Sequence, residues 1–184
     1  SWQTCSDLWY QASLNTQLQK IDYASGYLDI AAQMYPKQYT LVINVKGKEA
    51  YANSDDASKA AYAAMGLSPE ALSTDGLILV QDGVLQTYTT ESAYQLEIEL
   101  SNGKRLEITK SEDAKMPSIL YDKEEYNVEE DGISIFIYDN LTEQYIDCAF
   151  FKTNDTMRLN RKEREEESSE KEMGEEVDEQ YWGL

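Results

Sequence analysis

The chain contains no histidine, and this absence removes several common chemistries. Histidine is the usual general base, the usual activator of serine and cysteine nucleophiles, and the commonest metal ligand in proteins. Without it, the two cysteines, Cys5 and Cys148, are too few to complete a zinc site. We therefore expect no histidine-based triad, no metal centre and no cofactor.

Positive charge is also scarce. The chain has 35 acidic residues against 16 lysines and arginines, which gives a formal net charge of -19. Nucleic-acid binding requires a basic stripe that neutralises phosphates, and no cluster of lysines and arginines supplies one. We therefore expect no nucleic-acid partner. Acidity on this scale favours solubility and cationic partners, but it does not name a ligand.

Long hydrophobic runs are missing as well. No stretch approaches the roughly 20 apolar residues of a membrane span, and no signal peptide is evident. The chain begins at Ser1 rather than Met, so we expect an excised piece of a longer protein whose signal or membrane anchor lies outside it. A length of 184 residues with 41% hydrophobic content is enough for one domain with a real core.

The cysteines allow two interpretations that spacing cannot separate. Cys5 and Cys148 form one disulfide, or they are two buried thiols. Cys148 alternates with Ile146 and Phe150 along a strand-like segment. This pattern predicts that Cys148 faces the core as a small apolar residue.

Helical spacing dominates the first part of the chain. Residues 1–36 are expected to form a helical extension, capped at Thr4 or Ser6 and interrupted at Ser25-Gly26. A further helix is expected from 54 to 66, capped at Ser54 and stopped by Gly66. Its small-residue face, suited to packing on a sheet, consists of Ala57, Ala60, Ala61 and Ala64.

Strand patterns fill the middle of the chain. Residues 39–45 are rich in β-branched side chains and predict a central strand. Alternating segments then predict three hairpins, namely 77–80 with 84–89 around Asp82-Gly83, 94–100 with 104–109, and 132–153 with a polar connection from Asp139 to Gln144. Two short strands near 118–122 and 126–128 are expected across a turn at 123–125. On the second hairpin, Glu97 and Glu99 point outward and predict a solvated face.

These elements predict an α+β fold with a mainly antiparallel, curved, β-sandwich-like core, one packed helix and added N-terminal helices. The expected domain organisation is a helical extension over 1–36, a β-rich domain over 37–157 and an acidic tail over 158–184. The tail carries ten acids and five bases and few apolar residues, so it is expected to be a solvated tail or an exposed helix.

Several segments resemble a known family. The hairpin from Asp131 to Thr153 resembles the signature hairpin of the interleukin-like EMT inducer family. Residues 39–50, 54–68, 77–83 and 118–126 are similar to the family's strand, helix, second strand and lead-in to the hairpin. The order of these segments over 37–155 resembles that of bacterial modules attached to membrane enzymes of surface-polymer synthesis. The sequence departs from the family pattern at Lys152, at the loop from Lys46 to Glu49, and at Asp131 and Ser134.

The resemblance implies a non-catalytic, extracytoplasmic recognition module that binds carbohydrate or a cell-surface glycopolymer. It further implies a place in a larger membrane protein at the surface of a Gram-positive bacterium. The alternative is a protein–protein or assembly module, in which Trp2, Trp9 and the acidic tail contact the rest of the parent protein or a basic partner. An enzyme is not expected.

Loops at strand ends are the expected ligand site, because function concentrates on loops held by a rigid scaffold. The residues predicted to bind ligand lie in the loops 46–53 and 81–83, and they are Lys46, Lys48, Glu49, Gln81 and Asp82. The strand tyrosines are expected to be core or cross-strand partners more than ligand platforms, and they are Tyr88, Tyr94, Tyr121, Tyr126 and Tyr138.

Acid pairs invite comparison with glycosidases, which use two carboxylates across a cleft. The pairs are Asp55/Asp56, Glu97/Glu99, Glu124/Glu125 and Glu129/Glu130. The structural interpretation is favoured, because the first pair suits a helix start and the second suits a solvated sheet face. The spaced aspartates and glycine of a calcium-binding loop are missing.

Overall fold

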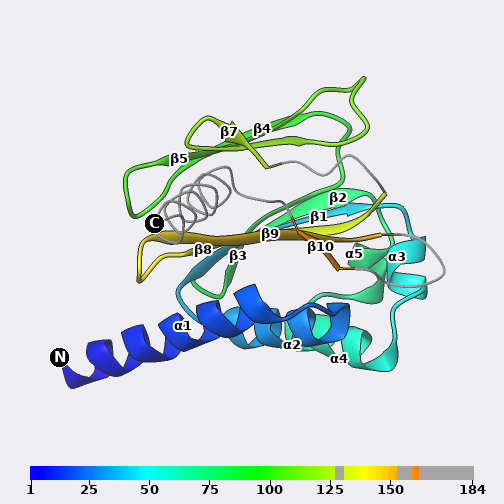
Figure 1. Ribbon diagram of the computed structural model, residues 1–184. Coiled ribbons are helices and arrows are strands. Elements are labelled where there is room, and N and C mark those ends of the chain that lie inside the picture. The colour runs from blue at the N-terminus through cyan, green and yellow to red at the C-terminus, as the bar shows by residue number, and fades with distance from the viewer. Residues whose placement is uncertain (127–130, 153–158, 162–184) are drawn as a thin grey trace, which may run out of the picture.

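The computed structural model describes residues 1–126, 131–152 and 159–161. The described chain forms three layers, with helices below, a six-stranded sheet in the middle and a four-stranded sheet above (Figure 1). Every strand pairing is antiparallel, and the two sheets face each other as in a β-sandwich. The predicted α+β class with a mainly antiparallel core is confirmed. Among the described residues, no helix has the length and apolar character to cross a membrane.

Two helices open the chain, α1 over Trp2–Lys20 and α2 over Ala24–Met34. The side chain of Ser1 accepts a hydrogen bond from the Thr4 N–H and caps α1, so the predicted cap at Thr4 or Ser6 is wrong. The break also falls earlier than Ser25-Gly26, because Ile21 already has an extended backbone.

The larger sheet contains β1 (Tyr39–Lys46), β2 (Gly76–Gln81), β3 (Val84–Thr89), β8 (Gly132–Asp139), β9 (Gln144–Lys152) and β10 (Leu159–Arg161). Its order is β10-β9-β8-β1-β2-β3, which places β1 centrally as predicted. Asp82 and Gly83 both have positive φ angles and form the predicted tight turn between β2 and β3. Residues 159–161 of the expected tail form β10, and the rest of that tail lies outside the described residues.

The smaller sheet contains β4 (Tyr94–Glu99), β5 (Arg105–Lys110), β6 (Ser118–Tyr121) and β7 (Glu124–Glu125), in that order. The tight turn before β7 is formed by Asp122 and Lys123, both with positive φ, so it lies earlier than the expected 123–125. The expected strand residues Asn127 and Val128 lie outside the described residues. Glu97 and Glu99 are exposed, which confirms the solvated outer face.

Three shorter helices, α3 (Glu49–Ala52), α4 (Asp56–Ala64) and α5 (Pro69–Leu72), lie between β1 and β2. The predicted alanine face of α4 is wrong, because three of its four alanines are exposed and only Ala61 is buried. Helix α4 instead buries Ser58, Ala61 and Tyr62 and packs beside α2. A face that must contact another helix as well as the sheet is not defined by small residues alone.

The start of α4 also differs in detail from the prediction. Asp55, not Ser54, caps the helix, since its carboxylate accepts a hydrogen bond from the Ser58 N–H at 2.7 Å. That bond lowers the pKa of Asp55. The Ser54 hydroxyl donates to the Ala50 carbonyl instead, which ties α3 to the start of α4.

Two separate cores lie on the two faces of the larger sheet. The core on the helix side is largely aliphatic, and strand β1 contributes Leu41, Ile43 and Val45 to it. The core between the sheets is rich in aromatic rings, and β1 contributes Val42. This alternation follows from the period of two in a strand.

A β-bulge in the last hairpin changes which face its residues occupy. The β8–β9 pairing shifts from Ile137–Asp147 to Tyr138–Tyr145, which leaves Ile146 as an extra residue. Ile146 therefore joins the helix-side core, whereas Cys148 is buried between the sheets. The burial of Cys148 is confirmed, but its predicted alternation with Ile146 is not.

The structure does not join Cys5 and Cys148 in a disulfide. Cys5 is exposed near the start of α1, where the helix projects beyond the sheet (Figure 1). Cys148 is buried on the far side of that sheet, and its thiol donates to the carbonyl of Tyr126 at 3.5 Å. The alternative of two buried thiols is therefore also wrong for Cys5.

Polar contacts hold α1 against the sheet at two points. Near its middle, the buried carboxylate of Asp139 accepts hydrogen bonds from the side-chain amides of Gln11 and Asn15, each at 2.8 Å. At its end, the Arg161 guanidinium donates to the carbonyls of Leu18 and Gln19. These carbonyls lack helical partners, so Arg161 satisfies acceptors that a helix leaves open. The second half of α1 therefore contributes to the same body as the sheet.

Candidate functional site

Three hairpin turns meet at one end of the sandwich. Asn140, between β8 and β9, donates from its side chain to Asp82, between β2 and β3, at 2.9 Å. Ser101, between β4 and β5, lies 2.9 Å from the Tyr138 hydroxyl and donates to the Asn140 carbonyl at 3.1 Å. These contacts connect the turns of both sheets and fix the rim of a groove.

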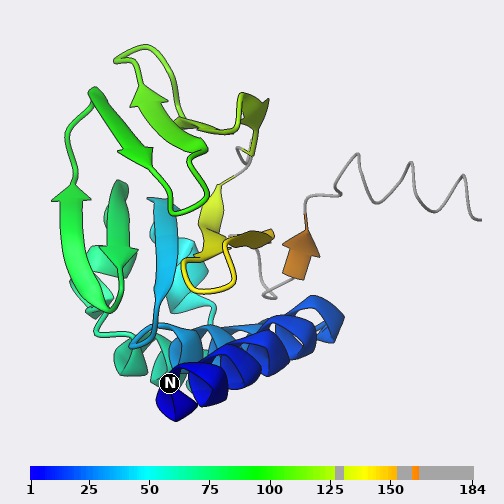
Figure 2. The ribbon, with the colours of Figure 1, turned by 90° about the vertical axis from the view of Figure 1, so that its left-hand side faces the viewer.

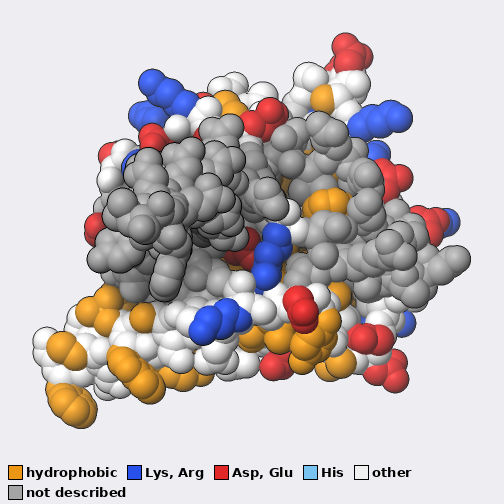
Figure 3. Space-filling view, in the orientation of Figure 1, with side chains coloured by type: hydrophobic (Ala, Val, Ile, Leu, Met, Phe, Trp, Pro, Cys, Tyr) orange, Lys and Arg blue, Asp and Glu red, His pale blue; other side chains and the backbone are white. Residues whose placement is uncertain are grey.

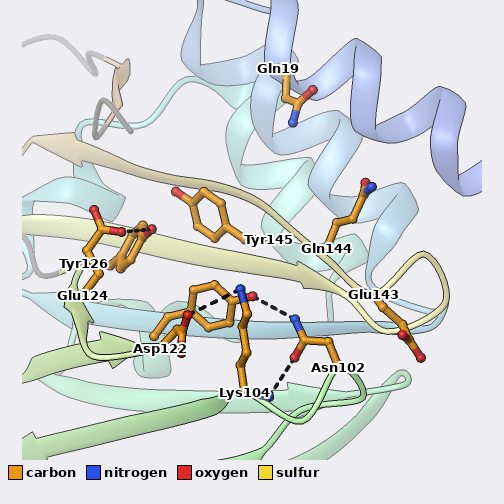
Figure 4. A pocket seen from close by; sticks show the side chains of 10 residues that line it. Gln19, Asn102, Lys104, Asp122, Glu124, Tyr126, Glu143, Gln144 and Tyr145 are labelled. Atoms are coloured by element: carbon orange, nitrogen blue, oxygen red, sulfur yellow. Dashed lines mark hydrogen bonds and ion pairs between the residues drawn. The ribbon is translucent and has the colours of Figure 1, made fainter. Parts of the chain in front are cut away.

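The groove has a volume of about 380 Å³ and lies between the two sheets, beside the end of α1. Residues from α1, from the β4–β5 and β6–β7 turns and from β9 surround it (Figure 4). The lining residues are Gln19, Asn102, Lys104, Tyr121, Asp122, Glu124, Tyr126, Glu143, Gln144 and Tyr145.

Tyrosine rings form the floor of the groove. The rings of Tyr121 and Tyr145 are stacked with centroids 5.9 Å apart, and Tyr126 lies 4.9 Å from Tyr145 at a tilt. Phe136 of β8 packs against these rings from the larger sheet, 5.4 Å from Tyr145. Each tyrosine is largely buried, with only 4% to 7% of its surface exposed, so packing against neighbouring side chains fixes the rings in place. The floor is therefore preformed.

Amide side chains form much of the rim. Asn102 donates to the Tyr121 hydroxyl at 3.0 Å and accepts from the Lys104 N–H at 3.0 Å, which orients both the turn and the ring. Gln19 reaches over from α1 and donates to the Ile146 carbonyl at 3.2 Å. Gln144 is exposed at the start of β9 (Figure 4). These amides offer both donors and acceptors at the mouth of the groove.

The charged side chains of the groove are mostly engaged with neighbours. Lys104 pairs with Asp122 at 3.4 Å, and the Tyr126 hydroxyl donates to Glu124 at 3.0 Å. Glu143 is exposed on the β8–β9 turn. One lysine against three acids leaves the lining negative. Within the described ranges, no three metal-ligating side chains gather in one place.

Burial also keeps the Tyr138 hydroxyl, which lies near the β4–β5 turn, protonated. It raises the pKa of Tyr138, and hydrogen bonds to Ser101 and the Asn102 N–H lower it only in part. The site therefore provides aromatic surface, amides and neutral hydroxyls. Such groups recognise a ligand by stacking and hydrogen bonding.

The five residues predicted to bind ligand do not form one site. Gln81 and Asp82 lie at the groove end of β1, since Gln81 pairs with Thr40. Lys46, in contrast, closes the opposite end of β1, and Lys48 and Glu49 follow it there. Because a strand rises about 3.3 Å per residue, the two groups lie roughly 20 Å apart. The predicted loops are also only partly right, because Lys46 ends β1, Gln81 ends β2 and Glu49 begins α3. The sequence could not tell which of these segments share an end of the sheet.

Lys46 lines a second hollow, of about 390 Å³, at the far end of the sandwich. Its ammonium pairs with Asp75 at 2.9 Å, and the Gly47 N–H donates to the same carboxylate at 2.7 Å. Lys110 in the same hollow donates to the carbonyls of Ser92 and Ser111. These contacts bind neighbouring loops to one another, so we interpret this hollow as structural.

The predicted roles of the tyrosines hold in part. Tyr121, Tyr126 and Tyr138 are buried between the sheets, which confirms their packing role. Tyr94 is partly buried, and burial raises its pKa to about 12. Tyr88 differs, because it is exposed on the edge strand β3.

The structural interpretation of the acid pairs also holds for some pairs and not for all. Asp55 caps a helix, and Glu97 and Glu99 are exposed, as the structural interpretation requires. Of the remaining pairs, Glu124 lines the groove, whereas Glu129 and Glu130 lie outside the described residues.

Sequence reasoning missed the groove residues Asn102, Gln144 and Tyr145. Asn102 lies within a predicted hairpin turn, Gln144 ends another and Tyr145 follows it, and these positions are the signal that could have found them. The turns themselves were recognisable from Asn102-Gly103 and from the polar segment 139–144. The sequence does not show that turns from the two different sheets meet in space.

Comparisons with known proteins return no match: no family model, no curated protein and no solved structure is similar to this chain. The function must therefore be inferred from the chemistry of the groove.

Proposed function

We propose that the groove binds a neutral carbohydrate without transforming it. The observation that carries this proposal is a preformed floor of three tyrosines beneath a rim of amide side chains. Sugar rings have apolar faces that pack on aromatic rings, and their hydroxyls exchange hydrogen bonds with amides. A volume of about 380 Å³ falls within the ~300–1,000 Å³ range of small-ligand pockets.

The charge of the groove narrows the ligand class. Its lysine is paired with Asp122, and Glu124 and Glu143 add further negative charge. An anionic polymer would meet repulsion there in addition to the net charge of -19. A neutral sugar, or one that carries an amino group, suits the groove better.

The engaged carboxylates support binding rather than catalysis. A glycosidase requires one carboxylic acid and one carboxylate placed across the scissile bond. In this groove Asp122 is held by Lys104, and Glu124 is held by the Tyr126 hydroxyl. We propose on this ground that the chain is not an enzyme.

The proposed biological setting follows from the family resemblance of residues 37–155. We propose an extracytoplasmic recognition module within a larger membrane protein that builds or decorates a surface glycopolymer in a Gram-positive bacterium. In that setting the groove would hold the acceptor chain while another part of the protein acts on it.

Calorimetric titration with a panel of neutral and anionic oligosaccharides tests the proposal. We expect a neutral oligosaccharide to bind, with an affinity that changes less than about twofold between low and high salt, since neutral contacts are not screened. Gln144→Ala removes a rim amide and should weaken binding, whereas Gln95→Ala, an exposed glutamine on the outer face of β4, should not. Binding confined to anionic sugars, or equal behaviour of the two variants, would refute the proposal.

A second candidate function, as an assembly module, is favoured by the first half of α1. Trp2 and Trp9 are 88% and 74% exposed there. Hydrophobic side chains gather over this projecting end of the helix (Figure 3). Exposed large apolar groups of this kind are typical of protein contacts. Replacing both tryptophans with serine should abolish binding to the parent protein if this function is correct, and should leave glycan binding unchanged.

A further inference from the structure

The edge strand β3 and the groove beside it combine two features of a peptide-binding site. We propose that an extended peptide with alternating apolar side chains and basic flanks adds to the sheet along β3. This site lies on the helix side of the larger sheet and is separate from the tyrosine groove.

The first feature is an open sheet edge. In the order β10-β9-β8-β1-β2-β3, strand β3 is terminal, and no described element lies beyond it (Figure 2). Its outer backbone groups therefore have no strand partner within the described part of the chain. An edge strand of this kind is a template for pairing with another segment.

This edge also lacks most of the usual protection of an edge strand. Edge strands are commonly guarded by charged residues or proline, but Val84–Thr89 contains neither in a chain with 28% charged residues. One protective device is present, a bulge at Gln86, where the pairing shifts from Leu79–Thr87 to Val80–Leu85. The regular segment from Thr87 to Thr89 remains for pairing.

The second feature is an apolar groove beside this edge, on the helix side of the sheet. It has a volume of about 410 Å³, and its lining includes the buried side chains of Ile78 and Val80. The α4–α5 loop forms one wall through Met65 and Leu67. Alternate side chains of an added strand point to the same face, so every second residue of a bound peptide would enter this groove.

The outer rim of the groove consists of side chains that nothing in the described structure covers. Leu85 is 58% exposed and Tyr88 is 45% exposed, and both line the groove. They pair across the ladder with Val80 and Ile78, so they face the helix side. A partner strand would complete the burial of both side chains.

The acidic residues around the apolar groove favour a partner with basic residues. Glu70 lines the groove, and Asp82 and Glu91 flank the two ends of β3, while the lining contains no lysine or arginine. Basic residues at the ends of an apolar peptide complement these acids. A second copy of the chain fits poorly, because antiparallel self-pairing centred on β3 places Asp82 opposite Glu91, and like charges directly opposite are destabilising.

The test uses labelled synthetic peptides in which valine, leucine, isoleucine or phenylalanine alternates with threonine between pairs of lysines. Their affinity is measured by fluorescence anisotropy, and amide exchange in the protein reports the location. We expect binding, slower exchange in β3, and loss of binding when the peptide backbone is N-methylated, because strand addition requires its N–H groups.

Two neighbouring residues supply a matched pair of variants. Leu85 and Val84 are both 58% exposed, but Val84 pairs with Gln81 and points to the opposite face. Leu85→Lys should weaken binding about tenfold or more, since it removes an apolar contact and repels the basic flanks. Val84→Lys carries the same charge and should weaken binding only about twofold to threefold through screened repulsion.

Three results would overturn the proposal. They are no binding by any peptide of the set, equal loss of affinity in the two variants, and protection located away from β3. Concentration-dependent dimers that Leu85→Lys dissociates would show instead that a second copy occupies the edge. Since the tyrosine groove is a separate site, glycan binding should be unchanged in both variants.

Discussion

The two faces of the larger sheet carry cores of different composition. On the helix side, aliphatic residues such as Leu41, Ile43 and Ile135 are fully covered by α1, α2 and α4 (Figure 1). On the other side, tyrosines and Phe136 fill the space between the sheets. At the end of this second core the hydroxyls of Tyr121 and Tyr138 meet Asn102 and Ser101, and there the core opens into the groove. One sheet thus separates a layer that stabilises the fold from a layer suited to binding.

The largest expected effect comes from a substitution that leaves a cavity in the helix-side core. Phe151 is fully buried there and meets Tyr27 edge to face with centroids 5.7 Å apart. Phe151→Ala should lower the free energy of unfolding by about 3–5 kcal/mol, because it leaves a cavity. Urea denaturation measures this loss, and the exposed change Val84→Ala should cost less than about 0.5 kcal/mol. Under native conditions, the glycan affinity of the folded fraction of Phe151→Ala should match that of the wild type.

The second prediction concerns Arg161 of β10, which pairs with Asp147 of β9 and also donates to carbonyls at the end of α1. Burial raises the pKa of Asp147, and the Arg161 guanidinium at 3.1 Å offsets this only in part. Arg161→Ala leaves a buried carboxylate without its cation and should cost about 3 kcal/mol at pH 7. Lys20→Ala, an exposed base at the end of the same helix, should cost little.

The pH dependence sharpens this prediction. A carboxyl group whose pKa is raised in the folded state favours folding below its unfolded pKa, and this contribution is lost as the pH rises through the folded value. Without Arg161 that folded pKa rises further. The deficit of Arg161→Ala should therefore shrink as the pH is lowered toward 4, and a deficit independent of pH would contradict this account.

The third prediction separates the cores by function. Tyr145→Leu keeps an apolar side chain in the groove floor but removes the aromatic ring, so stability should fall by about 1–3 kcal/mol. Glycan affinity should fall severalfold, since a ring on which a sugar packs is lost. Tyr62→Leu makes the same change in the helix-side core and should leave the affinity intact. Titration calorimetry compares the two variants directly.

The smallest expected effect lies at the far end of the sandwich. Burial raises the pKa of Asp75, but hydrogen bonds from the Gly47 N–H and Lys46 outweigh it, so the net pKa is lowered. Because the carboxylate is half-exposed, Asp75→Asn should cost only about 0.5–1 kcal/mol near pH 7. A lowered folded pKa stabilises the protein above the unfolded pKa, and this gain is lost as the pH falls through the folded value. The urea midpoints of the wild type and Asp75→Asn should therefore converge in acid.

Local patterns in the sequence predicted most elements of the fold. The β-branched run at 39–45, the Asp82-Gly83 turn and the alternating segment 132–139 each determine their structure through neighbouring residues alone. The predicted alanine face of α4 was wrong, because the buried face of this helix is determined by its contact with α2, which is distant in sequence. The bulge at Ile146 was not predicted, because a bulge depends on how two strands pair.

The site was harder to predict than the fold. Turn residues such as Asn102 and Gln144 are recognisable one hairpin at a time, yet only the facing of the two sheets brings them together. The predicted set from Lys46 to Asp82 joined loops from opposite ends of β1 for the same reason. The topology of the sheets determines which strand ends lie together, and short sequence motifs do not encode the topology.

Nuclear magnetic resonance during titration with a neutral oligosaccharide tests the central claim most directly. The account predicts that the ring signals of Tyr121, Tyr126 and Tyr145 shift together with the side-chain amides of Asn102 and Gln144, at both low and high salt. Shifts confined to the Lys46 end, or no shift in any tyrosine of the groove, would contradict it.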